Sequence, residues 1–187
     1  MAQKQEVTVI PECFVDTNLT ETLIGMACNH RKGCAMVTKQ MKEKCADGFA
    51  LGIIDKDKRP VPYISEFALI AETESLQILK HKDRNHYIIY VIPAVEGFIL
   101  KASEELGVNL ADYGLPADMD GLKKETKQQD SKKDPRFKRL FTDLLPALNV
   151  SLMKSLITYL LEHRFDADVK VIQRMLATSV VRNNPTL

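Results

Sequence analysis

The length, composition and charge of the chain set the first limits on what it can be. It has 187 residues, 45% hydrophobic and 27% charged, values that are ordinary for one globular domain with or without a small appendage. The net charge is +1, so any contact with nucleic acid requires a local basic patch. No apolar stretch reaches the roughly 18 residues of a membrane helix, and we expect a cytoplasmic protein without a membrane partner.

The N-terminal part of the chain predicts a strand, two helices and a second strand. Residues 6–15 are mostly apolar and β-branched, which is typical of a strand. The polar residues 16–18 are common helix N-caps, so we expect a helix from there to about residue 29. Apolar residues recur on one face over 34–46, which predicts a second helix. The continuous apolar run 49–54 predicts a strand covered on both faces.

The cysteines lie in this same part of the chain. Cys28, His30 and Cys34 are close in sequence but lack the paired Cys-x2-Cys spacing of common zinc sites. We therefore interpret the cysteines as reduced thiols, which agrees with a cytoplasmic compartment.

The middle of the chain predicts a hairpin followed by a helix. Residues 66–72 could form a short strand or a helix, whereas 75–81 and 86–92 predict two strands of a hairpin, with His81 and His86 exposed beside its turn. The next helix is expected to start at Pro93 and to end at Gly107. Its first turn contains Glu96, which either stabilises the helix N-terminus or adds a carboxylate to a site.

The composition changes in the C-terminal part. We expect an α/β domain over 1–115, with a central, mostly parallel sheet flanked by helices, and a C-terminal helical extension over 116–187. The polar run 123–134 is interpreted as an exposed linker or a solvated helix end. The apolar faces of the helices after it could bind a second copy of the chain or a protein partner.

Carboxylates follow both strands of the N-terminal part. Asp55 and Asp57 come directly after the buried run 49–54, and Glu12 and Asp16 lie at the end of the first strand. If these strands are parallel neighbours, the carboxylates converge at one edge of the sheet, where open α/β sheets bind ligands. Such a cluster favours Mg²⁺ or Mn²⁺, which prefer oxygen ligands. Cations beside it would bind a phosphate backbone, namely Lys56, Lys58 and Arg59. The simpler interpretation of Asp-x-Asp is a polar loop after a strand.

The pattern resembles the Toprim fold of topoisomerases, bacterial primases and overcoming-lysogenization-defect-type nucleases. "VTVIPE", followed some 43 residues later by "LGIIDKDKR", is similar in order and separation, and the resemblance covers residues 6–106. It implies that Glu12 is a general acid/base or metal ligand and that Asp55 and Asp57 are metal ligands. The family's usual glycine beside the glutamate is absent, which leaves open a non-catalytic module with the same fold.

A second resemblance is to PIN-type nucleases, whose first strand ends in a motif like "FVDTN". It implies that Asp16 is the first metal ligand and Asn18 a supporting polar residue, whereas simple helix capping is the structural alternative. Either resemblance implies Mg²⁺-dependent, nuclease-like phosphodiester chemistry on nucleic acid.

Overall fold

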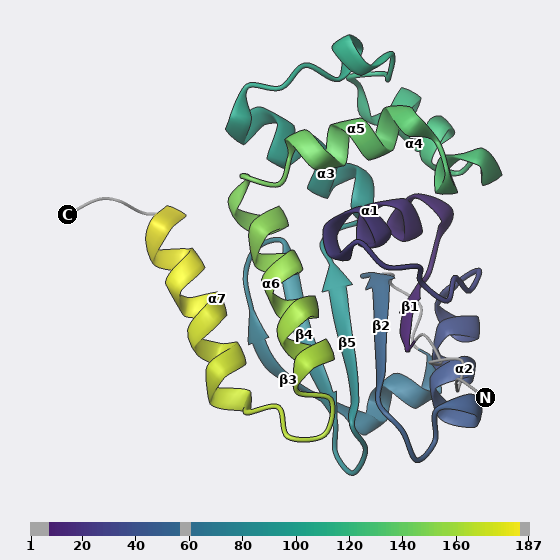
Figure 1. The fold of residues 1–187 in the computed structure, drawn as a ribbon, viewed down its shortest axis with the longest axis vertical. Coiled ribbons are helices and arrows are strands. Elements are labelled where there is room, and N and C mark those ends of the chain that lie inside the picture. Colours follow the sequence, from purple (N-terminus) through teal and green to yellow (C-terminus); the bar gives the residue numbers. More distant parts are fainter. Residues whose placement is uncertain (1–7, 57–60, 184–187) are drawn as a thin grey trace.

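A five-stranded sheet forms the centre of the computed structural model, which describes residues 8–56 and 61–183 (Figure 1). The strand order is β1-β2-β5-β4-β3. β1, β2 and β5 are parallel, and β4 and β3 continue the sheet antiparallel, so the α/β class is confirmed and the sheet is mixed. The strands are β1 (Val9–Pro11), β2 (Ala50–Asp55), β3 (Phe67–Glu72), β4 (Leu76–His81) and β5 (His86–Val91).

Helices cover both faces of the sheet. The described helices are α1 (Phe14–Ile24), α2 (Cys34–Lys44), α3 (Val95–Leu106), α4 (Met119–Thr126), α5 (Pro135–Asp143), α6 (Leu148–Glu162) and α7 (Val169–Asn183), with short 3-10 turns η1 (Pro62–Glu66), η2 (Leu110–Tyr113) and η3 (Gln129–Lys132). Figure 1 shows α6 across one face and α7 beside it, with α1, α3 and α5 grouped beyond the arrowheads of β2 and β5. On the opposite face, α2 and η1 pack in a smaller core.

The two cores follow from the alternation of side chains along the strands. Leu51 and Ile53 of β2 face the larger core, whereas Ala50 and Ile54 face the smaller one, and all four are buried. The strand is therefore covered on both faces, as its continuous apolar run predicts. The larger core also contains side chains of α5, α6 and α7. The division into two domains stays a prediction.

A glycine lets α2 pack closely against the sheet. Gly52 lies between Leu51 and Ile53 in β2, and its Cα faces α2. A Cβ atom at this position would lie 3.1 Å from Met41 Sδ and 3.1 Å from Val37 Cγ1, both tighter than ordinary van der Waals contact. The absence of a side chain therefore sets the distance between helix and sheet.

The start of the chain differs from its prediction. Residues 6 and 7 of the predicted strand 6–15 lie outside the described residues; within the described part β1 spans Val9–Pro11, and α1 begins at Phe14, before the predicted caps. Cys13 is the N-cap, since its Sγ accepts a hydrogen bond from the Asp16 N–H at 3.3 Å. The helix also ends before residue 29, because Gly25 adopts a left-handed conformation at φ 66°.

The hairpin β4–β5 and the α3 termination at Gly107 agree with their predictions, but the hairpin histidines do not. His81 and His86 were expected to be exposed and are instead 2% and 0% exposed. His86 Nε2 donates to the Cys45 carbonyl at 2.8 Å, and the Tyr63 hydroxyl donates to His86 Nδ1 at 2.7 Å. Burial is tolerated because both ring nitrogens have partners.

The polar run 123–134 forms the end of α4, the turn η3 and the cap of α5. Most of its side chains are exposed, but Thr126 and Ser131 are buried. The Asn18 side-chain amide of α1 donates to the carbonyls of Ser131 and Asp134 at 2.8 and 3.1 Å. This run is thus fixed on α1.

Among the described helices, none is by itself long and apolar enough to cross a membrane. α5 and α6 together meet the length and composition, but they meet at an angle of 99° and bury apolar side chains in the protein core.

Candidate functional site

Two acids predicted from separate segments meet at the carboxyl edge of the parallel strands. Glu12 follows β1 and Asp55 is the last residue of β2, its parallel neighbour. Glu12 Oε2 accepts a hydrogen bond from the Asp55 N–H at 3.1 Å. Its Oε1 accepts from the N–H of Cys34, the first residue of α2, at 2.9 Å. The carboxylate of Glu12 therefore joins the ends of two strands to a helix N-terminus.

Asp55 and Glu96 meet at the start of α3. Asp55 Oδ1 accepts a hydrogen bond from the Val95 N–H at 2.9 Å, which satisfies one of the unpaired donors of the helix N-terminus. Glu96 is the next residue, is 7% exposed, and its Oε1 accepts from the Thr126 hydroxyl at 2.5 Å. Of the two roles left open for Glu96, the structure supports both, because it lies in the first helical turn and its charge acts on Asp55.

Asp16 is the most deeply buried acid of the group. It lies in the first turn of α1 and is 1% exposed, and neither of its carboxylate oxygens has a hydrogen-bond partner among the described residues. Burial raises the pKa of Asp16 to about 7; the adjacent Cys13 thiol lowers the pKa, and the charges of Glu12 and Glu96 raise it. The Cys13 thiol and backbone N–H thus compensate only part of the cost of burying this acid.

The pKa values of Asp55 and Cys13 are raised by the same cause as that of Asp16, which is burial. Burial raises the pKa of Asp55 to about 9, with further contributions from the charges of Asp16, Glu12 and Glu96, while the Val95 N–H opposes the shift. Burial and the charge of Asp16 also hold the pKa of the Cys13 thiol far above its usual range. These effects favour the protonated thiol of Cys13 over the thiolate.

The carboxylate cluster, which we define as Glu12, Asp16, Asp55 and Glu96, lies at the N-termini of α1, α2 and α3. Each helix dipole stabilises a negative charge by about 0.3–1 kcal/mol at a typical site. The pKa values of Asp16 and Asp55 are nevertheless raised, so burial and mutual repulsion outweigh the dipoles. At neutral pH the cluster must retain protons or bind a cation.

The remaining predicted residues are only partly described. Lys56 is exposed next to Asp55, and its N–H donates to the Val91 carbonyl at 3.0 Å. Asp57, Lys58 and Arg59 lie outside the described residues, so their predicted roles stay predictions. Sequence reasoning missed the Thr126 hydrogen bond to Glu96, because the two residues are 30 positions apart and no local pattern links them.

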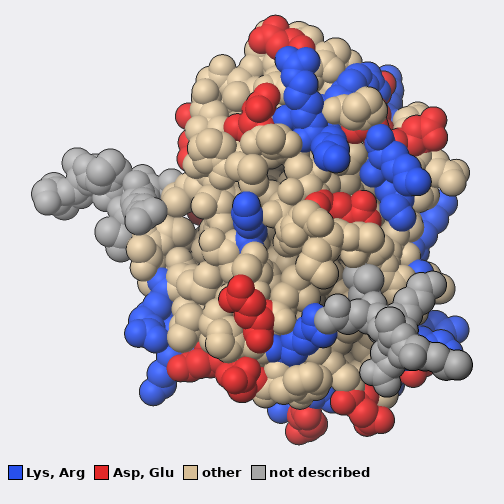
Figure 2. All heavy atoms as spheres, viewed as in Figure 1, with Lys and Arg blue, Asp and Glu red and all other residues tan. Residues whose placement is uncertain are grey.

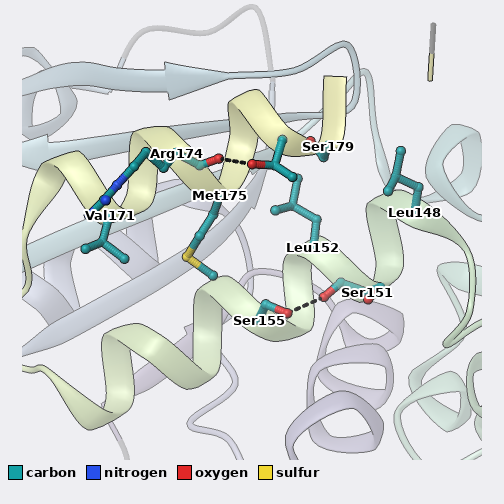
Figure 3. A pocket seen from close by; sticks show the side chains of 9 residues that line it. Leu148, Ser151, Leu152, Ser155, Val171, Arg174, Met175 and Ser179 are labelled. Carbon is teal, nitrogen blue, oxygen red and sulfur yellow. Dashed lines mark hydrogen bonds between the residues drawn. The ribbon is translucent and has the colours of Figure 1, made fainter. Parts of the chain in front are cut away.

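A separate hollow of about 380 Å³ lies between α6 and α7. Figure 3 shows Leu152 and Met175 reaching into it from the two helices. Its hydroxyl groups bond to helix carbonyls, as Ser155 does to the Ser151 carbonyl at 2.9 Å, and Arg174 is the one ionisable side chain in its lining. This hollow therefore lacks a set of groups that could perform acid, base or nucleophilic chemistry.

Comparisons of the chain with protein-family models, with curated proteins and with solved structures found no match. The geometry and charge of the carboxylate cluster are therefore the features of the molecule that bear on its function.

Proposed function

We propose that the carboxylate cluster binds a hydrated Mg²⁺ or Mn²⁺ ion and that the protein performs metal-dependent, nuclease-like phosphodiester chemistry on nucleic acid, as a Toprim-like enzyme. The observation that carries the proposal is the convergence of four acids at the carboxyl edge of β1 and β2, including the fully buried Asp16, whose pKa is raised despite its contacts with Cys13. A divalent cation would balance this charge without the protons that the cluster otherwise needs.

The donor chemistry of the cluster fits such an ion. All four side chains offer oxygen, the ligand that Mg²⁺ and Mn²⁺ prefer. No three His, Cys, Asp or Glu side chains in the described part of the chain are arranged to hold a metal ion by themselves. A hydrated Mg²⁺ ion would require fewer protein ligands, since Mg²⁺ usually keeps several waters and binds one or two carboxylates plus a substrate phosphate.

The depth of each residue suggests its role. Asp55 and Glu12 are half-buried and would hold the ion and its water shell, whereas Asp16 and Glu96 are buried and supply charge behind them. The bound ion would orient and polarise a phosphate group. Two backbone donors fix the Glu12 carboxylate, which suits a positioned general acid or base. Lys56 adds positive charge at the surface for the phosphate backbone.

The position of Glu12 favours the Toprim resemblance over the PIN resemblance. Glu12 directly follows β1, as the first acid of a Toprim-like site would. The "FVDTN" segment instead lies within α1, so Asp16 is not at a strand end, although it belongs to the cluster. Asp16 thus supports a metal site in either scheme.

Asp55→Asn is the most direct test. The asparagine oxygen can still accept from the Val95 N–H, so the cap of α3 is kept while one negative charge is removed. We expect the variant to bind Mg²⁺ or Mn²⁺ about tenfold or more weakly by isothermal titration calorimetry. The rate at which the variant cleaves labelled oligonucleotides in the presence of either metal should also be lower than that of the unmodified protein.

Asp83→Asn is the matched control, because Asp83 is an exposed acid in the β4–β5 turn. It should bind metal like the unmodified protein. If the unmodified protein binds neither ion up to millimolar concentration, or if both variants weaken binding equally, the proposal is wrong.

The alternative is a Toprim-like module without catalysis, used for binding or assembly. It is favoured by the hydrogen bonds that Glu12, Asp55 and Glu96 make within the chain, which are also ordinary structural contacts. The apolar side chains of α5 to α7 are largely used in the chain's own core, which weighs against a large interface through them. Metal binding without any oligonucleotide cleavage would favour this alternative.

A further inference from the structure

A groove runs along α1 on the side where η3 packs. One hollow, of about 630 Å³, is lined by Phe14 and His30 together with η3 and the start of α5. A second, of about 230 Å³, is lined by Asn18, Glu21 and Thr22 of α1 and by Lys138. The two hollows share Lys132 and Lys133. They therefore form one groove with two lysines at its middle, which we call the η3 groove.

The chain segment beside this groove is far more basic than the protein as a whole. Residues 123–139 contain eight Lys or Arg and three Asp or Glu, a net charge of +5, whereas the whole chain has +1. Figure 2 shows Lys and Arg side chains gathered over the end of the molecule where α4 and α5 lie in Figure 1. Asp134, an acid of the groove, is paired with Arg136 at 2.7 Å. The lining itself contains three lysines, Lys132, Lys133 and Lys138, and three acids, Glu21, Asp130 and Asp134, so its positive charge is local to the lysines rather than a property of the whole groove.

An aromatic pair lies at one end of the groove. The rings of Phe14 and His30 are stacked with centroids 4.6 Å apart, and both side chains are half-buried. The Thr17 hydroxyl donates to the Cys13 carbonyl at 2.7 Å, so His30 Nδ1, 3.0 Å from Thr17 Oγ1, must be the donor of that hydrogen bond. Nε2 of the neutral ring is then an acceptor. Burial and the charge of Lys132 lower the pKa of His30, which keeps the ring neutral.

A flat aromatic pair can stack against a nucleotide base, and adjacent lysines can contact its phosphate. We infer that the η3 groove binds single-stranded nucleic acid, with one base stacked on the Phe14–His30 pair and backbone phosphates against Lys132 and Lys133. This inference rests on the proposed function, because it supplies the substrate strand to the carboxylate cluster. The groove is close to that cluster along the chain, since Phe14 and Asp16 share the first turn of α1 and the Asn18 amide holds η3 on the same helix.

The role of the lysines is tested by measuring oligonucleotide binding without metal, so that binding in the groove is measured independently of metal binding at the carboxylate cluster. Fluorescence anisotropy with labelled 12-residue oligonucleotides, one of DNA and one of RNA, is measured in EDTA. Lys132→Ala/Lys133→Ala should weaken binding about tenfold or more and should reduce the slope of log affinity against log salt by about 1.4, roughly 0.7 for each lost phosphate contact. Lys123→Ala/Lys124→Ala removes the same charge from an exposed turn of α4 and should change affinity less than about threefold.

The aromatic pair is tested by its effect on base stacking. A 2-aminopurine in the oligonucleotide should lose fluorescence on binding, because stacking quenches it. His30→Ala should remove most of this quenching, and His30→Phe should keep it, since phenylalanine preserves the flat ring. Quenching that is unchanged in His30→Ala would overturn the stacking site.

Two results separate the groove from the proposed function. Oligonucleotide binding that depends on Lys132 and Lys133, in a protein that binds no metal, would support the groove and reject the enzyme. Metal binding with no oligonucleotide binding at about 100 µM protein, the weak limit of non-specific contact, would reject the groove. Equal loss of affinity in the two double-lysine variants would also reject it, as would preference for duplex over both single strands.

Discussion

At the scale of single residues, Asp16 is the acid whose removal should be most informative. Its carboxylate is fully buried with Cys13 as its neighbouring donor, and its pKa is raised to about 7. Asp16→Asn removes a charge that burial disfavours, so the stability that the metal-free variant gains over the unmodified protein should be larger at pH 8 than at pH 5 by about 2 kcal/mol. The gain should vanish only below about pH 4, because near pH 5 Asp16 is protonated in the folded state but still ionised in the unfolded state. Urea unfolding followed by circular dichroism measures both values.

The control for this variant is again Asp83→Asn, which should alter stability by less than about 0.5 kcal/mol at either pH. An Asp16→Asn protein that is destabilised equally at pH 5 and pH 8 would show that the side chain makes a necessary contact in both protonation states. That result would contradict the interpretation of Asp16 as an unsatisfied charge.

At the scale of elements, the contact between β2 and α2 depends on Gly52. Gly52→Ala places a methyl group 3.1 Å from both Met41 Sδ and Val37 Cγ1, so the helix must move. We expect a loss of about 1–3 kcal/mol in the free energy of unfolding. Gly48→Ala is the matched control, because its nearest neighbour is the Cys45 carbonyl oxygen at 3.7 Å.

A double-mutant cycle gives the sharper measurement. Val37→Ala makes room for the new methyl group, so the cost of Gly52→Ala should be smaller by at least 0.5 kcal/mol in the Val37→Ala background. Additive effects of the two substitutions would mean that Gly52 is needed for another reason than the approach of α2.

The elements that could be predicted from sequence are those with a local signal. β2 is a continuous apolar run, and α3 has an apolar face and a terminal Gly107. The start of α1 could not be predicted, because the apolar residues before Asp16 suit a strand as well as the buried face of a helix. The meeting of Glu12 and Asp55 followed from the expectation of parallel strands, which the structure has. The bond from Thr126 to Glu96 and the position of η3 depend on contacts between distant segments, which no local pattern encodes.

At the scale of the whole molecule, the cluster should make the metal-free protein less stable as the pH rises. The pKa values of Asp16 and Asp55 are raised to about 7 and about 9, so the folded state binds more protons than the unfolded state between about pH 4 and those values. The stability is therefore fully present below about pH 4 and is lost progressively as the pH rises, up to about pH 7 for Asp16 and about pH 9 for Asp55. His86 has the opposite effect, since burial lowers its pKa and its contribution is lost as the pH falls below about 6.5.

The expected slope is about 1 kcal/mol per pH unit between pH 7 and 8.5, close to the value for one proton. Urea unfolding in EDTA at several pH values measures it, and circular dichroism is the suitable signal because the chain has no tryptophan. Asp55→Asn should flatten the profile, and millimolar Mg²⁺ should flatten it as well. A profile that rises from pH 7 to 8.5 would contradict the raised pKa values.

Because Glu12 accepts two hydrogen bonds, replacing it changes the structure as well as the chemistry of the cluster. Its oxygens receive the N–H groups of Cys34 and Asp55, so a glutamine in its place would set an amide donor against one of them. The usual neutral replacement for a catalytic glutamate is therefore not conservative in this fold. The same side chain fastens α2 to the end of β2, and folding and chemistry cannot be separated by changing it alone.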